Sequence, residues 1–169
     1  MKNILKLLLI LSFITVIVSC KKNNVNPETI ICFEDTDSKA LFTEQADVNM
    51  ETMSPVAGEY RLFWYEINSG TLTTKIYIKA PMEGNSFSLN NNDINSGKVI
   101  YIQSCPNCNL IPVKAVGGSV KGENRYPGKR ADQTRWLLEA KIILQGINTP
   151  MFKDSIYFKR DFTPNFVYN

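Results

Sequence analysis

The sequence predicts a mainly β protein, a single antiparallel β-sandwich or small β-barrel with at most one or two short helices. Three observations support this prediction. After Gly58 the chain alternates apolar and polar residues with a period of two over most of its length. Turn-forming residues separate these runs, and aromatic and β-branched residues, which strands favour, are frequent within them.

The first predicted element is a β-hairpin over residues 59–80. Gly70 lies in its short loop and can adopt the left-handed conformation that a tight hairpin requires. In the first strand, the run Phe63-Trp64-Tyr65 predicts core on one face and an aromatic surface patch on the other. The second strand places one set of side chains on a single face: Leu72, Thr74, Ile76, Ile78 and Ala80.

Shorter strands follow the hairpin. Residues 85–89 and 98–104 are predicted strands, with a polar loop over residues 90–97 between them. Residues 110–116 predict a further strand that Pro112 interrupts, which favours an edge position or a bulge because proline has no N–H. Gly117 and Gly118 would bend this strand before residues 119–121 continue it.

Residues 134–146 fit both a strand and a helix. The strand puts Trp136, Leu138 and Ala140 on one face, whereas the helix would be capped by Asp132 or Thr134. We favour the strand, because residues 155–162 alternate cleanly and can pair with it across a loop. Residues 37–50 predict a short helix that starts at Asp37. No phosphate-binding strand–loop–helix unit and no internal repeat is found in the sequence.

The first twenty residues have the features of a targeting segment. Lys2 and Lys6 precede an apolar run over residues 7–18, which is shorter than the about 20 residues a membrane-spanning helix needs. The segment ends in Ile17-Val18-Ser19-Cys20, which resembles the lipobox of bacterial lipoproteins. The resemblance implies cleavage before Cys20 and acylation of that residue. An ordinary secretory peptide with a chance cysteine is the alternative.

This interpretation divides the chain into three parts. Residues 1–19 would be the signal peptide, residues 20–57 the lipidated cysteine with a polar tether and an acidic segment, and residues 58–169 the β-domain. The expected location is the cell envelope, on a bacterial membrane and most simply the outer one. Both a periplasmic and a surface-facing orientation fit the sequence. Lys21 and Lys22 would lie beside the lipid, where anionic head groups attract them.

The charge distribution argues against a nucleic-acid partner. Loss of Lys2 and Lys6 with the signal peptide lowers the formal charge from +3 to +1, so no basic excess remains. The charge is uneven: residues 28–59 are acidic and residues 98–169 basic. The two segments either contact each other, face different partners, or form a mixed solvated surface.

The chain contains no histidine, which excludes Ser-His-Asp and Cys-His mechanisms and histidine-ligated zinc. Glu34, Asp35 and Asp37 lack the spacing of a calcium loop, and no local pattern pairs two carboxylates for glycoside hydrolysis. We therefore predict no catalytic residues, no metal, no cofactor and no enzymatic activity.

Three cysteines remain if Cys20 is lipidated: Cys32, Cys105 and Cys108. The sequence Cys105-Pro106-Asn107-Cys108 fits a type I turn whose ends approach within disulfide range. We favour a structural disulfide closing this turn; a bond from either cysteine to Cys32 is the alternative. A redox centre would need a helix after the motif, where a β-like run follows instead, and a metal site would lack ligands.

A long polar loop over residues 121–135 combines basic and aromatic side chains. Such a loop can stack on a sugar or grip a carboxylate, and a solvated flexible loop is the alternative. The leading interpretation is a non-catalytic binding module for a protein or glycan partner. The second is an inhibitor that inserts this loop, or residues 104–110, into a secreted hydrolase such as a protease; the third is a thiol–disulfide oxidoreductase using Cys105 and Cys108. The binding candidates are Arg125, Tyr126, Lys129, Arg130 and Arg135.

Overall fold

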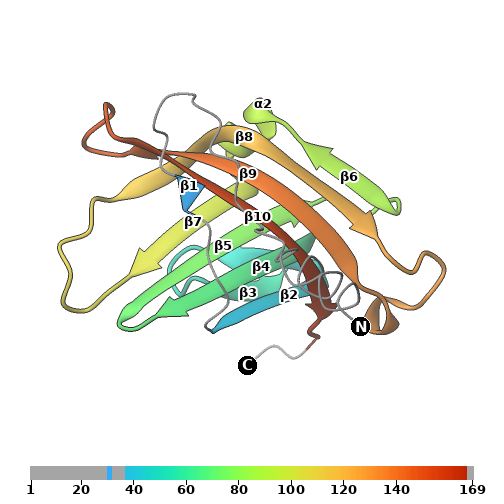
Figure 1. Ribbon diagram of the computed structural model, residues 1–169. Coiled ribbons are helices and arrows are strands. Elements are labelled where there is room, and N and C mark those ends of the chain that lie inside the picture. Colours follow the sequence, from blue (N-terminus) through green and yellow to red (C-terminus); the bar gives the residue numbers. More distant parts are fainter. Residues whose placement is uncertain (1–29, 32–36, 167–169) are drawn as a thin grey trace, which may run out of the picture.

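The computed structural model describes residues 30–31 and 37–166, which form one curled sheet (Figure 1). The mainly β prediction is confirmed. The targeting segment, Cys20 and Cys32 lie outside the described residues. The strands are β1 (Ile30–Ile31), β2 (Ser38–Asn49), β3 (Ser54–Ala57), β4 (Tyr60–Ser69), β5 (Leu72–Ala80), β6 (Ser86–Leu89), β7 (Val99–Ser104), β8 (Val113–Asn124), β9 (Trp136–Gly146) and β10 (Lys153–Pro164).

The strands follow the order β6-β8-β9-β10-β2-β4-β5-β7, with β1 beside β10 and β3 beside β2. Neighbours are antiparallel except for β10 with β2 and β1 with β10. The sheet curls into a half-barrel whose edges are β6 and β7 (Figure 1). The chain between these edges contacts both sides of the opening and buries Ile94 completely.

The predicted polar loop at residues 90–97 is instead a helical turn, made of α2 (Asn91–Asp93) and η2 (Ile94–Lys98). Asn90 caps it, because its side-chain oxygen accepts from the backbone N–H groups of Asn92 and Asp93. The carboxylate of Asp93 accepts in return from the Asn90 N–H. A turn this short has no hydrophobic period, so its polar sequence was indistinguishable from a loop.

Several predicted strands are confirmed with their partners. The hairpin of β4 and β5 turns over Gly70 and Thr71, and Gly70 has a φ of 61°. Residues 136–146 form a strand, β9, and pair in antiparallel register with β10. The register of β8 against β9 shifts between Ala115 and Gly117, next to the two glycines expected to bend the strand. The strand predicted from residue 110 begins only at Val113.

The helix predicted at residues 37–50 is wrong, because these residues form β2 and pair with β4. A bulge between Thr43 and Ala46, with Gln45 at a φ of 54°, changes which side chains face inward. Because that shift breaks the period of two, the sequence pattern did not predict this strand. The sheet thus begins before residue 58, where we expected the β-domain to start.

Aromatic side chains fill the concave side of the sheet. Phe63 lies at the centre of this core, within 5.5–5.7 Å (ring centroids) of Phe42, Phe87, Trp136 and Phe162. Phe63 and Tyr65 are buried, as predicted for one face of β4. Trp64, on the other face, is half-buried against a smaller cluster on the convex side: Ala46, Val48, Leu62 and Tyr77, with Ile100 and Ile102.

The strands β8, β9 and β10 run between two ends of the molecule. One end carries the loop of residues 125–135 and is called the arginine end (right in Figure 1). The other carries the loops of residues 105–112 and 147–152 and is called the disulfide end (left in Figure 1). Within residues 30–31 and 37–166, no helix has the length and apolar character needed to cross a bilayer.

Candidate functional site

The loop at the arginine end has a fixed base. The Arg125 N–H donates to the carbonyl of Arg135 at 2.8 Å, which ties together the two points where the loop leaves β8 and enters β9. The side-chain oxygen of Asn124 accepts from the Tyr126 N–H at 2.9 Å and from the buried Thr134 hydroxyl. Because these bonds lie at the loop's base, the backbone that carries the neighbouring side chains is held in place.

Four side chains beside this base line a cavity of about 340 Å³: Arg125, Tyr126, Arg135 and Asp161. We call this cavity the arginine pocket. Asp161 comes from β10, and its carboxylate lies 3.2 Å from Nε of Arg125. Tyr126 is 51% exposed and lines this pocket.

The arginine pocket carries an excess of positive charge. Two guanidinium groups, which stay protonated in proteins, face one carboxylate. Within the part of the chain that the structure describes, no carboxylate lies within ion-pair distance of the Arg135 guanidinium. A guanidinium presents parallel N–H donors that match a carboxylate, so the pocket suits an anionic group of that shape.

Two of the five predicted binding residues lie away from this pocket. The Lys129 N–H donates to the Tyr126 carbonyl at 3.1 Å and closes a turn at the loop's tip. Arg130 precedes η3 (Ala131–Gln133) and forms an ion pair with Asp132 at 3.2 Å. The structure therefore brings together Arg125, Tyr126 and Arg135, and adds Asp161, which sequence reasoning missed. Only the register of β10 against β9 would have placed Asp161 there.

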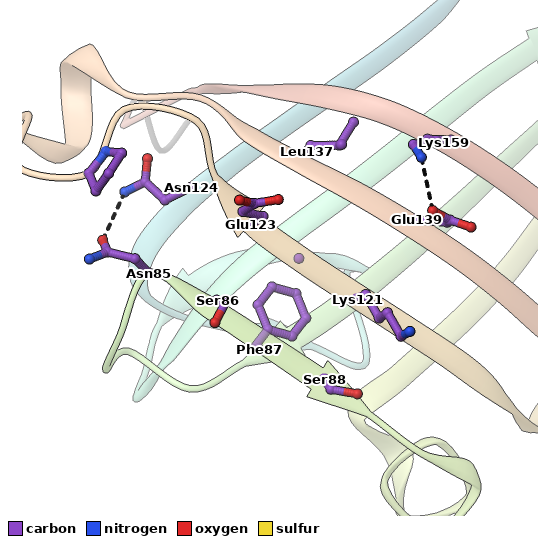
Figure 2. Close-up of a pocket in the computed structure, with 12 residues that line it drawn as sticks. Asn85, Ser86, Phe87, Ser88, Lys121, Glu123, Asn124, Leu137, Glu139 and Lys159 are labelled. Carbon is purple, nitrogen blue, oxygen red and sulfur yellow. Dashed lines mark hydrogen bonds and ion pairs between the residues drawn. The ribbon is translucent and has the colours of Figure 1, made fainter.

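A shallow groove of about 820 Å³ adjoins the pocket on the convex side of β6, β8, β9 and β10 (Figure 2). Asp161 is paired with Leu137, which lines the groove, so the two hollows are neighbours across β9 and β10. Asn124 and Pro127 line the groove at the loop's base. Its polar lining consists of Asn85, Ser86, Ser88, Lys121, Glu123, Glu139 and Lys159.

The charges along this groove are largely compensated. Nζ of Lys159 lies 3.1 Å from a carboxylate oxygen of Glu139, and Figure 2 shows this ion pair on the groove's surface. The hydrogen bond from Lys159 lowers the pKa of Glu139 below its ordinary value. Lys121 is the cross-strand neighbour of Glu139 on the other side. The groove thus offers polar contacts, while the excess charge stands in the arginine pocket.

Two side chains of the acidic segment, Glu44 and Asp47, form ion pairs with strands β4 and β5. Glu44 contacts Arg61 at 2.9 Å, and Asp47 contacts Lys79 at 2.5 Å, so both partners lie on β4 and β5. Burial alone would raise the pKa of Asp47, but hydrogen bonds from Lys79 and the Val48 N–H lower it overall. No cluster of three or more His, Cys, Asp or Glu side chains suited to a metal occurs among residues 30–31 and 37–166.

Cys105 and Cys108 form a disulfide, with their Cα atoms 5.4 Å apart. The Cys108 N–H points to the Cys105 carbonyl at 3.4 Å, so the bond closes the predicted turn on itself. The hydroxyl of Thr71, at the tip of the β4–β5 hairpin, contacts the Cys105 sulfur at 3.6 Å. An irregular segment and then β8 follow the motif, so the thiols do not stand at a helix N-terminus that would activate them.

Comparison with protein-family models, curated proteins and solved structures finds no match for this chain.

Proposed function

We propose that this chain is a membrane-anchored lipoprotein of the bacterial envelope whose β-domain is a non-catalytic binding module. The observation that supports it most directly is the arginine pocket, where Arg135, which has no ion pair among the described residues, lines the same cavity as Arg125 and an exposed Tyr126. A group without an internal charge partner is available to a ligand. The hydrogen-bonded loop base reduces the entropy lost when that ligand binds.

The anchor is inferred from the N-terminal sequence. Ile17-Val18-Ser19-Cys20 resembles a lipobox, and the residues before it have the charge and apolar run of a signal peptide. Two or more acyl chains on Cys20 would hold the protein stably, because each buried methylene contributes about 0.8 kcal/mol. Mass spectrometry of the mature N-terminus tests this anchor directly, and an unmodified Cys20 would contradict it.

The chemistry of the pocket favours a ligand that carries a carboxylate. An acidic sugar fits best, because Arg135 can bind its carboxylate while the ring of Tyr126 stacks on the sugar face. The adjoining groove, lined by Ser86, Ser88 and Asn85, would take further sugar units of a chain through hydroxyl and amide contacts. A protein partner that presents an Asp or Glu side chain is the other form of this proposal.

Binding of the mature protein to acidic glycans, matched neutral glycans and acidic peptides tests the proposal. We expect saturable binding to an acidic ligand that falls about tenfold or more in Arg135→Ala, since hydrogen bonds to charged groups contribute about 1.5–3 kcal/mol. Lys129→Ala is the matched control, because it removes the same charge from the same loop outside the pocket. Equal losses in both variants would indicate nonspecific charge attraction.

Inhibition of a secreted hydrolase, such as a protease, is the second candidate. The disulfide that closes residues 105–108 favours it, because a preorganised loop loses little entropy on entering an active site. The expected result is stoichiometric inhibition that disappears when residues 104–110 or 121–135 are replaced. Full hydrolase activity in an excess of the protein would exclude this function for the enzyme tested.

A thiol–disulfide oxidoreductase is the third candidate, and it uses the same two cysteines. It predicts disulfide reduction that is lost in Cys105→Ser. Reductase activity that is equal in this variant and in the unsubstituted protein would end this candidate.

A further inference from the structure

The disulfide end exposes a group of large apolar side chains. They come from the two loops that join β7 to β8 and β9 to β10. Met151 is 95% exposed and Ile147 is 53% exposed, although both types of side chain are normally covered. We call this group the apolar tip, and it consists of Leu110, Ile111, Ile147, Met151 and Phe152.

Hydrogen bonds hold the two loops of the apolar tip together. The Ile147 N–H donates to the carbonyl of Pro112 at 2.8 Å, which places Ile147 beside the residues that follow Ile111. The Phe152 N–H donates to the Thr149 carbonyl at 2.9 Å and closes the turn that carries Met151. The Cys105–Cys108 disulfide restrains the start of the other loop. These apolar side chains therefore protrude from braced loops.

The direction of β1 shows from which end the N-terminal chain enters the sheet. Ile30 pairs with Ser155 and Ile31 with Ile156, in parallel register. Because β10 starts at Lys153 at the disulfide end, a parallel strand also starts from that end. Ile30, the first described residue, thus lies toward the apolar tip.

The length of the tether between Cys20 and Ile30 distinguishes two orientations of the domain, with the apolar tip or with the arginine end on the membrane. Ten residues lead from Cys20 to Ile30, and fully extended they span at most about 35 Å. The eleven residues of β9 are about 37 Å long, so contact of the arginine end with the membrane would need the whole tether to run back along the sheet, fully extended. Contact of the apolar tip needs little of it.

Basic residues border the apolar tip on the convex side. Lys114 of β8 and Lys153 of β10 are both exposed, and each is the cross-strand neighbour of Gln145 in β9. Cations beside apolar side chains suit the interface of a bilayer, where the apolar groups enter and the lysines meet anionic head groups. Contact with another protein would not require lysines beside the apolar side chains.

We propose that the apolar tip docks on the bilayer that holds the acyl chains of Cys20, with a lipid surface as its partner. This inference rests on the lipid anchor of the proposed function, and it adds an orientation. The disulfide end lies on the membrane, and the arginine pocket points away from it. The Cys105–Cys108 bond then serves to brace a membrane-facing loop.

The test is fluorescence quenching of the full acylated protein in vesicles that contain brominated acyl chains and anionic lipid. Met151→Trp places a reporter on the apolar tip, and Tyr126→Trp places the matched reporter on the exposed loop at the opposite end. The unsubstituted protein supplies the background from Trp64 and Trp136. We expect loss of emission and a blue shift for Met151→Trp, and neither change for Tyr126→Trp.

The outcomes are distinct from those that test the proposed function. Unquenched Met151→Trp in a protein whose acylation is confirmed by mass spectrometry overturns the docking and leaves the anchor intact. Equal quenching of both reporters overturns the orientation. A blue shift of Met151→Trp that depends on protein concentration without vesicles would show that the tip joins two copies, and would also overturn the proposal. Reduced quenching in Ile147→Ser, with the anchor retained, supports it.

Discussion

At the scale of single residues, the fit of side chains across β6 and β8 depends on one glycine. Figure 2 shows Phe87 between these two strands. A Cβ atom added to Gly122 would overlap the ring of Phe87, which is buried in the aromatic core. The absence of a side chain at residue 122 thus allows an aromatic ring to cover the edge of the sheet.

Gly122→Ala should therefore lower the free energy of unfolding by about 1–3 kcal/mol, because the added methyl group displaces the ring from a packed core. Denaturant unfolding measures this change. In a Phe87→Leu background the same substitution should cost clearly less, since the overlapping ring atoms are gone. Equal costs in both backgrounds would show that the Phe87 ring is not the source of strain.

A second residue-scale prediction concerns alkaline pH. Burial raises the pKa of Tyr101 to about 12, and Asp154 acts in the same direction, while hydrogen bonds with Thr74 and Gln103 oppose it. Burial also raises the pKa of Tyr77. The folded state binds these protons more tightly than the unfolded state, so their contribution is complete below pH 10 and is lost at higher pH, for Tyr101 as the pH rises toward about 12.

The free energy of unfolding should accordingly fall between pH 9 and pH 12, because the pKa of Tyr101 is close to 10 in the unfolded chain and about 12 in the folded chain. Tyr101→Phe should flatten part of this decline, and Tyr126→Phe, at an exposed site, is the control. An unchanged slope in Tyr101→Phe would contradict the assignment.

At the scale of elements, the disulfide-closed turn stabilises only its own part of the fold. The bond encloses only four residues, so the chain-entropy model gives it about 2 kcal/mol of stabilisation. Its contacts are with the β4–β5 hairpin tip and its own turn. The arginine pocket stands at the opposite end of β8 and β9, and nothing in the turn contacts it.

The double variant Cys105→Ser/Cys108→Ser should therefore lose at most about 2 kcal/mol of unfolding free energy. Its affinity for a ligand of the arginine pocket should equal that of the unsubstituted protein. Thermal or denaturant unfolding and the binding assay measure the two quantities. A loss of ligand affinity in this variant would place the binding surface at residues 104–110, as the inhibitor candidate requires.

At the scale of the whole molecule, the two halves of the sheet are joined by few backbone contacts. The strands β10 and β2 pair through Thr163 with Leu41 and Pro164 with Phe42, and the Asn165 N–H donates to the Phe42 carbonyl at 2.7 Å. Side chains add to this connection. Arg61 of β4 is 6% exposed and lies 4.3 Å from the ring centroid of Trp136 on β9, so it links the two halves through the core.

Arg61 is also fully engaged by hydrogen bonds, with Glu44 at 2.9 Å and with the carbonyls of Pro81 and Met82. Arg61→Met should lower the free energy of unfolding by about 2–4 kcal/mol, because the two carbonyls and the Glu44 carboxylate lose the hydrogen bonds that Arg61 donates. The fluorescence of Trp136 should change with it. Lys129→Met, which removes an exposed charge, is the control, and equal stability of both variants would contradict the linking role of Arg61.

The sequence by itself determined the features that depend only on short stretches of chain. The period of two in residues 72–80 specified a strand, because it needs only one buried face, and in residues 136–146 it favoured a strand over the alternative helix. The four residues Cys105–Cys108 favoured the disulfide that the structure contains, since a tight turn brings its ends within reach. Where the chain departs from the simple pattern, as at the bulge in β2 and the capped turn after Asn90, local reading failed.

Only the tertiary structure decided which distant residues meet. The register of β9 against β10 brings Asp161 to Arg125 and leaves Lys129 and Arg130 outside the pocket. The alternation of strand directions gathers Ile111, Ile147 and Met151 at one end and the arginine pocket at the other. The physical reason is that strand pairing and the curl of the sheet depend on contacts between residues far apart in the chain, which no local pattern specifies.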